Sequence, residues 1–206
     1  ILLGGVPGVA PAEVVILGGG VVGVNAARVF LGLGANVYLM DQDIKRLHYV
    51  DNFFMGRVVT LMSNPLNVDK MVRFADVVVG AIQVPGARSP ILVTRELVRS
   101  MRQRSIIMDV AVTTGGCVET TRPTTHTAPT YIEEGVIHYC VPNMTGIVAR
   151  TATHAFNNAA WPYIHSIASD GLDAAIEKSS SLARGVNTRA GKIMLPGLAA
   201  AYNMSS

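Results

Sequence analysis

The sequence predicts an α/β fold in which helices cover both faces of a doubly wound parallel sheet. Half of the 206 residues are hydrophobic and only 15% are charged, a composition that suits parallel strands buried on both faces. Strand and helix signals also alternate, with short connections, up to residue 110. Such alternation generates a parallel sheet with crossover helices. A chain of this length buries one full core, so we expect one domain with an appendage.

Apolar runs and helix-capping residues place the elements in order along the chain. Gly34 suits a left-handed cap after the first helix, Pro65 the start of the third, and Thr94 the N-cap of the fourth. We expect strands at residues 14–17, 36–40, 57–62, 76–82, 105–110 and 136–141, and helices at 21–33, at 43–54, from 65 and from 94. Six strands are the number expected of a complete doubly wound sheet.

Two segments depart from this alternation. Residues 113–135 are rich in Thr, Gly and Pro and too polar for a strand, so we expect a long loop there. After residue 143 the chain is Ala-rich, and we expect helices near residues 151–168 and 172–178, followed by a short tail. Pro162 is expected to kink or break the first of these helices. We therefore expect one domain at residues 1–148 and a C-terminal helical segment at 149–206.

The turn between the first strand and the first helix is rich in glycine. Gly18 permits a sharp turn, Gly20 lets backbone N–H groups approach a phosphate, and Gly23 lets the helix pack close to the sheet. The helix N-terminus adds about half a positive charge facing that phosphate. This context predicts a Rossmann unit whose turn holds the pyrophosphate of NAD. A tight turn without a ligand is the alternative.

Asp41 lies at the end of the second strand, 18 residues after Gly23. A carboxylate there can accept hydrogen bonds from the adenosine ribose hydroxyls of NAD. It would also repel the 2′-phosphate of NADP, by about 4 kcal/mol at a separation of about 4 Å and an effective dielectric of 20. The position favours NAD, although Lys45 and Arg46 offset part of this repulsion. Capping of the following helix is the alternative role.

The ends of the later strands are expected to line the same crevice, because open parallel sheets bind ligands beyond their carboxyl edge. For each residue alone, ordinary loop structure is an equal alternative, but together the strand ends indicate a site. These residues are Ser63, Ile82, Gln83, Val110, Ala111, Val112, Thr113, Val141, Pro142, Asn143 and Met144.

Several functional classes lack support in the sequence. The two cysteines form no CxxC pair, and the five histidines have no carboxylates at metal-ligand spacing, so we expect no metal site and a reducing, cytoplasmic setting. The sequence contains no GxSxG motif, which would have indicated nucleophilic hydrolysis.

The sequence also gives no sign of binding to nucleic acid or of a membrane span. The basic cluster at residues 99–104 has no interleaved aromatic residues, which argues against nucleic-acid binding. No apolar run is long enough to span a membrane. The first residues indicate a chain that begins inside a longer one.

Several motifs resemble bacterial alanine dehydrogenase along nearly the whole chain. The most specific are Gly-Gly-Cys-Val-Glu-Thr at residues 115–120, Arg-Pro-Thr-Thr-His at 122–126, and His-Tyr-Cys-Val-Pro-Asn-Met at 138–144. Residues 3–9, the glycine-rich turn, 61–65 and 84–87 continue the match. The related nicotinamide nucleotide transhydrogenase shares the Rossmann core but fits the Thr-rich loop and the tail less well.

The resemblance implies an enzyme that interconverts L-alanine with pyruvate and ammonia using NAD, and that assembles as a hexamer. It places Val21 and Val22 at the pyrophosphate, Asp41 and Arg46 around the adenosine, and Asn143 next to pyruvate. It places Ser63 near the adenine. The ribose and nicotinamide would be bordered by Ile82, Gln83 and residues 110–113. The rest of the site would be completed by Arg122 and residues 141–144. Residues 149–206 would belong to a truncated substrate domain.

Two departures from the family limit the expected activity. The family's substrate-binding Arg and Lys and its catalytic His come from an N-terminal region that this sequence does not contain. The family also has an Asp where this sequence has Thr113, the one candidate catalytic position here. We therefore expect a chain that binds NAD but does not turn over alanine unaided. The alternatives are a non-catalytic NAD-binding or assembly module and the soluble nucleotide domain of a transhydrogenase.

Overall fold

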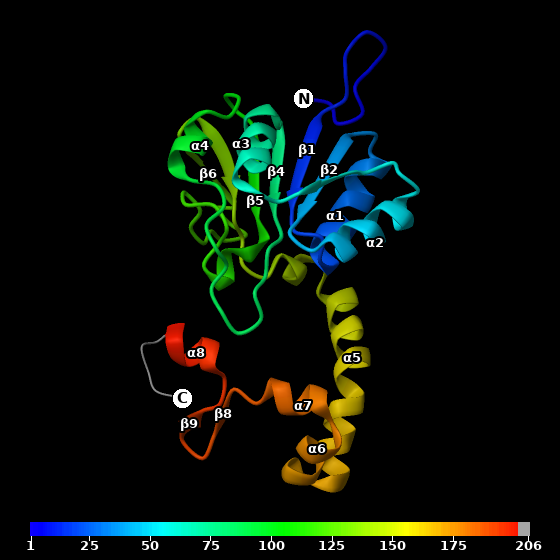
Figure 1. Ribbon diagram of the computed structural model, residues 1–206, viewed down its shortest axis with the longest axis vertical. Coiled ribbons are helices and arrows are strands. Elements are labelled where there is room, and N and C mark those ends of the chain that lie inside the picture. Colours follow the sequence, from blue (N-terminus) through cyan, green and yellow to red (C-terminus); the bar gives the residue numbers. More distant parts are fainter. Residues whose placement is uncertain (202–206) are drawn as a thin grey trace. The chain divides into compact units, whose positions relative to one another are not determined.

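The structure, a computed structural model, describes residues 1–201 and divides into two compact units (Figure 1). Unit 1 comprises Ile1–Val84 and Arg88–Pro142. Unit 2 comprises Pro85–Ala87 and the chain from Asn143 onward.

Unit 1 is built on a seven-stranded sheet with the order β3-β2-β1-β4-β5-β7-β6. The first six strands in this order pair in parallel, and β6 is added antiparallel to β7 at the edge. The order of those six is that of a doubly wound dinucleotide-binding fold, so the predicted fold class is confirmed. The strands are β1 (Glu13–Leu17), β2 (Asn36–Asp41), β3 (Val59–Met62), β4 (Val77–Gly80), β5 (Ile106–Asp109), β6 (Thr130–Glu133) and β7 (Val136–Tyr139).

Side chains alternate between the two faces of the sheet and form two apolar cores. From β1, Val14 and Ile16 pack with helices α1 (Val21–Gly32) and α2 (Ile44–Phe54). Val15 and Leu17 pack on the other face with α3 (Pro65–Phe74) and α4 (Arg95–Arg99). Helices therefore cover both faces of the sheet, which is why the central strands β1 and β4 are almost wholly apolar.

The expected helix boundaries in unit 1 are confirmed by their caps. Gly34 follows α1 in the left-handed region, with φ +85°. Pro65 is the first residue of α3, and the Thr94 hydroxyl accepts a hydrogen bond from the Leu97 N–H at the start of α4. Asp43, rather than Asp41, caps α2 by accepting from the Lys45 N–H.

Residues 113–135 are not a single loop, so the expectation of no strand there is wrong. β6 lies within this segment and pairs with β7 through a tight turn at Glu134 and Gly135, both with positive φ. An edge strand contacts the sheet along one side only, so polar residues are tolerated, and Tyr131 and Ile132 supply the strand propensity. Residues Val110–Thr114, the start of which was expected in β5, form the 3₁₀ helix η1.

Unit 2 is mainly helical. It contains η2 (Met144–Val148), α5 (Ala149–Asp170), α6 (Leu172–Lys178), α7 (Ser180–Gly185), β8 (Thr188–Arg189), β9 (Lys192–Ile193) and α8 (Pro196–Ala201). α5 continues through Pro162, so the expected break is wrong. Proline removes a single backbone donor, and a helix of 22 residues retains its other hydrogen bonds. The expected short tail contains α7, α8 and a two-stranded hairpin. Residues 202–206 of the expected segment lie outside the described residues.

Candidate functional site

The carboxyl ends of the central parallel strands surround a cleft of about 740 Å³ in unit 1. The β1–α1 turn forms its floor, the end of β2 one side, and the end of β4 with η1 the other. The expected site residues that line it are Gly18, Gly20, Val21, Val22, Asp41, Arg46, Ser63, Ile82, Gln83, Val110, Ala111 and Thr113. Met40, Gln42, Asp43, Ala81, Val84, Pro90, Leu92 and Thr114 also line it.

The glycine-rich turn is shaped by two close backbone approaches. Gly18 has φ +106°, and a Cβ there would lie 2.6 Å from the Ala81 carbonyl oxygen. A Cβ on Gly23 would lie 1.9 Å from the Gly18 carbonyl oxygen. Neither backbone oxygen can move aside, so the turn requires glycine at both positions. These contacts bring the start of α1 against the end of β1.

The N-terminus of α1 differs from that of the other unit 1 helices. Asp43, Asn64 and Thr94 cap α2, α3 and α4 with side-chain oxygens, whereas Gly20 leaves the first turn of α1 without a side-chain cap. Val21 and Val22 line the cleft at this end, and Val21 is 82% exposed. The uncapped N–H groups and the positive end of the helix dipole therefore favour an anionic group in the cleft.

Asp41 is held by backbone donors on two sides. Its Oδ2 accepts from the Gly19 N–H at 2.7 Å, and its Oδ1 accepts from the Asp43 N–H at 2.9 Å. The side chain of Arg46 lies beside the same turn, within 3.2 Å of a Cβ built on Gly19. The Asp41 carboxylate thus joins the end of β2 to the glycine-rich turn while it lines the cleft.

Asp109, which the sequence reasoning did not select, is fully buried at the end of β5. Its oxygens accept hydrogen bonds from the Ala111 N–H, the Cys117 N–H and the Thr121 hydroxyl, at 2.8–3.0 Å. An acidic residue directly after an apolar strand was the available signal, because an unpaired carboxylate is costly to bury. Burial, with the Asp109 charge nearby, raises the pKa of the Cys117 thiol, so this cysteine is an inert neutral group.

A hydroxyl pair ties the loop after β4 to η1. The hydroxyls of Ser89 and Thr114 lie 3.0 Å apart, and the Ser89 hydroxyl also lies 3.0 Å from the Ile82 carbonyl oxygen. The Ser89 N–H donates to the Thr114 carbonyl at 2.9 Å. Both segments line the cleft, so these contacts fix the width of its β4–β5 side.

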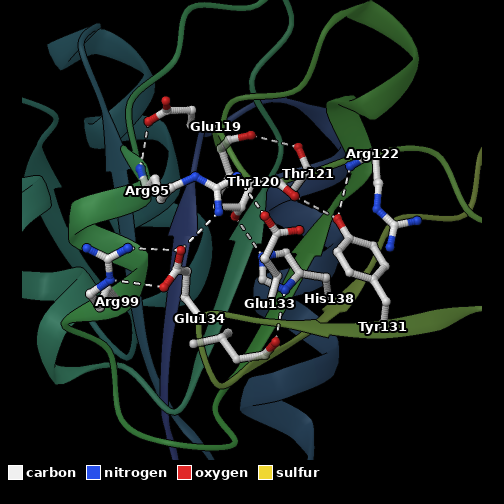
Figure 2. Close-up of polar contacts among 12 residues, drawn as sticks. Arg95, Arg99, Glu119, Thr120, Thr121, Arg122, Tyr131, Glu133, Glu134 and His138 are labelled. Atoms are coloured by element: carbon white, nitrogen blue, oxygen red, sulfur yellow. Dashed lines mark hydrogen bonds and ion pairs between the residues drawn. The ribbon is translucent and has the colours of Figure 1, made fainter.

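The remaining expected site residues do not line this cleft. Gly23 lies beneath the turn, and Val112 and Val141 are buried. The guanidinium carbon of Arg122 lies 3.9 Å from the centroid of the Tyr131 ring. Figure 2 includes both side chains. Pro142 ends unit 1. Asn143 and Met144 belong to unit 2.

The buried His138 belongs to a separate polar cluster (Figure 2). Its Nδ1 lies 3.0 Å from the Val136 carbonyl oxygen and its Nε2 lies 2.8 Å from the Thr120 hydroxyl. This pairing assigns the proton to Nδ1, so Nε2 accepts from Thr120. Burial lowers the pKa of His138, and Tyr131 stacks on its ring. Both ring nitrogens of His138 are therefore paired within the protein, which gives the side chain a structural role.

Residues 1–201 contain no group of three or more His, Cys, Asp or Glu side chains that could hold a metal ion. None of the helices described is both long and apolar enough to cross a membrane.

Comparison with known proteins decides the family. A family model described as alanine dehydrogenase/PNT, C-terminal domain, matches residues 1–196. The chain belongs to this family. Among relatives of this alanine dehydrogenase/PNT chain, an alanine dehydrogenase from Halomonas elongata is 47% identical over 204 residues, which cover 99% of this chain and 55% of the relative.

Solved structures agree with this assignment. An L-alanine dehydrogenase is 50% identical, with a TM-score of 0.86, and the match covers 98% of this chain and 56% of that one. A transhydrogenase from Sinorhizobium meliloti is 23% identical, with a TM-score of 0.63, a likeness that shows the fold alone. This alanine dehydrogenase/PNT chain therefore spans about half the length of the relatives that it matches.

Proposed function

We propose that this chain is the NAD-binding portion of an alanine dehydrogenase, an oxidoreductase that converts L-alanine to pyruvate and ammonia and also runs in reverse. The observation that carries the proposal is the cleft beside the glycine-rich turn, in a chain of this family. Its uncapped α1 N-terminus suits a diphosphate, and the Asp41 carboxylate beside it suits a ribose.

The residues of the cleft fit the two halves of NAD. Asp41, Arg46 and Ser63 lie on the β2–β3 side and would surround the adenosine. Ile82, Gln83, Val110, Ala111 and Thr113 line the β4–β5 side and would border the nicotinamide ribose and ring. When bound, NAD supplies the carbon that accepts hydride from alanine. The chain's own residues orient the dinucleotide across the sheet.

The substrate side of the site is the part that this chain leaves incomplete. We propose that Asn143 contacts pyruvate, and that Arg122, Val112, Val141, Pro142 and Met144 complete the site when the rest of the enzyme is present. Thr113 stands in the cleft where relatives of the family have an aspartate, as inferred from the resemblance. Hydride transfer needs the reacting carbons within about 3.5 Å and an acid–base group for the amine protons. Thr113 lacks the negative charge that the aspartate has at this position.

We also propose that residues 149–206 belong to the substrate domain, that the enzyme is cytoplasmic, and that it is a homo-oligomer, a hexamer by resemblance. Large apolar side chains on α5 support contacts with protein outside this chain. Phe156 is 70% exposed and Trp161 is 63% exposed. An exposed apolar surface of this kind is typical of an interface.

A turnover assay tests the proposal. The chain alone is expected to bind NADH but not to reduce pyruvate in the presence of ammonia, because the substrate side is incomplete. The same chain joined to the N-terminal half of a relative should gain activity, and Thr113→Asp in that fusion should raise kcat by about tenfold or more. Detectable reduction of pyruvate by the chain alone would contradict the proposal.

Thr113 also favours a second candidate, a non-catalytic NAD-binding or assembly module. In that case neither fusion, with Thr113 or with Thr113→Asp, would reduce pyruvate although both bind NADH. A matched Thr127→Asp fusion introduces the same charge at an exposed loop position and should leave the activity of the Thr113 fusion unchanged.

A further inference from the structure

We propose that Asp109 is a positioning residue that holds η1 in place and so sets the nicotinamide side of the cleft. The inference rests on the proposed NAD function. The Asp109 carboxylate bonds to both ends of the turn that contains η1. Oδ1 accepts from the Ala111 N–H at its start, and Oδ2 accepts from the Cys117 N–H beyond its end, each at 3.0 Å. The Asp109 carboxylate therefore links the start of the turn to the residues after its end.

Thr121 supplies the third donor to this carboxylate. Its hydroxyl oxygen lies 2.8 Å from Asp109 Oδ2 and 2.8 Å from the Val118 carbonyl oxygen. The hydroxyl has one proton, and the charged oxygen is the stronger acceptor. If the proton pointed to Val118 instead, two oxygen lone pairs would face each other at the buried carboxylate. Thr121 therefore donates to Asp109.

Two glycines leave space for the Asp109 carboxylate and for the Cys117 thiol, whose Sγ lies 3.9 Å from Oδ1. A Cβ on Gly80 would lie 2.9 Å from Oδ1, and a Cβ on Gly116 would lie 2.8 Å from Oδ2. Gly80 is also the register partner of Asp109 in the β4–β5 pair. Among the described residues no Lys or Arg forms an ion pair with Asp109, so neutral donors alone stabilise the carboxylate. Loss of one donor should consequently shift the turn.

The turn affects one half of the cleft. Val110, Ala111, Thr113 and Thr114 all line it, and all lie in η1. The adenosine half is made by other elements, the end of β2 and the residue after β3. Displacement of η1 should therefore weaken binding of the nicotinamide half of NADH and spare a ligand that lacks it. ADP is such a ligand, because it retains the adenosine and the diphosphate but lacks the second ribose and the nicotinamide.

The test compares NADH with ADP in Thr121→Val and Thr121→Ser variants of the full chain. Thr121→Val keeps the side-chain volume and removes the donor, and we expect its Kd for NADH to rise about five- to tenfold. Its Kd for ADP should change less than about twofold. Thr121→Ser keeps the hydroxyl and should restore the affinity for NADH. Binding of NADH is measured by its fluorescence, and binding of ADP by calorimetry.

Two results would overturn the positioning role. One is unchanged affinity of folded Thr121→Val for both ligands, and the other is an equal loss for both, which indicates general destabilisation. Asp109→Asn gives a second measurement, because its amide presents a donor to the Cys117 N–H or the Ala111 N–H, and it should weaken binding of NADH more than binding of ADP. If the wild-type chain bound neither NADH nor ADP, the proposed NAD function itself would be rejected.

Discussion

Replacement of Gly23 by alanine is expected to destabilise unit 1 by about 2–4 kcal/mol and to abolish NADH binding. The added Cβ would overlap the Gly18 carbonyl oxygen at 1.9 Å, with Ile16 Cγ2 only 3.3 Å away. Both neighbours belong to the turn or to the core strand beneath it, so α1 itself must move. That movement takes the helix N-terminus away from the diphosphate. Urea unfolding and an NADH titration measure the two effects.

Gly32→Ala is the matched control for this substitution. Gly32 ends the same helix, is exposed, and has no atom within 4 Å of an added Cβ. Alanine there should be neutral or stabilising, by up to about 1 kcal/mol, with unchanged NADH affinity. A Gly23→Ala chain with the urea stability and the NADH affinity of the wild type would contradict this. It would show that the site does not depend on the close approach of α1 to β1.

Replacement of Asp41 by alanine should change the cofactor preference. The carboxylate contributes charge and also holds the Gly19 N–H, so we expect NADH affinity to fall by about tenfold or more. The affinity for NADPH should fall less. Removal of the carboxylate ends its repulsion of the 2′-phosphate and leaves Lys45 and Arg46 nearby. The ratio of the NADPH Kd to the NADH Kd is therefore expected to fall by at least about tenfold.

Asp51→Asn is the charge-matched control, because Asp51 is an exposed carboxylate on α2 that does not line the cleft. Both titrations should give wild-type constants for it. If Asp41→Ala left the ratio of the two constants unchanged, Asp41 would act only as a link between β2 and the turn, and the selection of NAD would come from elsewhere.

Local signals in the sequence were sufficient for the α/β core of unit 1. The apolar runs of β1 and β2, the left-handed Gly34 and the capping Thr94 act through contacts close in the chain. Each could therefore be predicted without knowledge of the rest of the fold. The strand at β6 could not, because an edge strand is polar and forms only by pairing with β7.

The candidate site was predictable where a motif has a fixed geometry. The glycine-rich turn and Asp41 have such a geometry, since the β1–α1 unit determines where both lie. The buried Asp109 was missed because its partners come from the turn it closes and from Thr121, 12 residues further on. Arg122 was expected at the site, but in the structure it stacks on Tyr131, a residue of the strand that the sequence did not reveal.

A titration of the folded chain with NADH and, separately, with NADPH tests whether the cleft is an NAD site. We expect saturable binding of one NADH per chain, with a Kd below about 1 mM, and NADPH binding at least about tenfold weaker. ADP should compete with NADH. A chain that is folded by circular dichroism and binds no NADH at several times that concentration would contradict the assignment of the cleft as an NAD site.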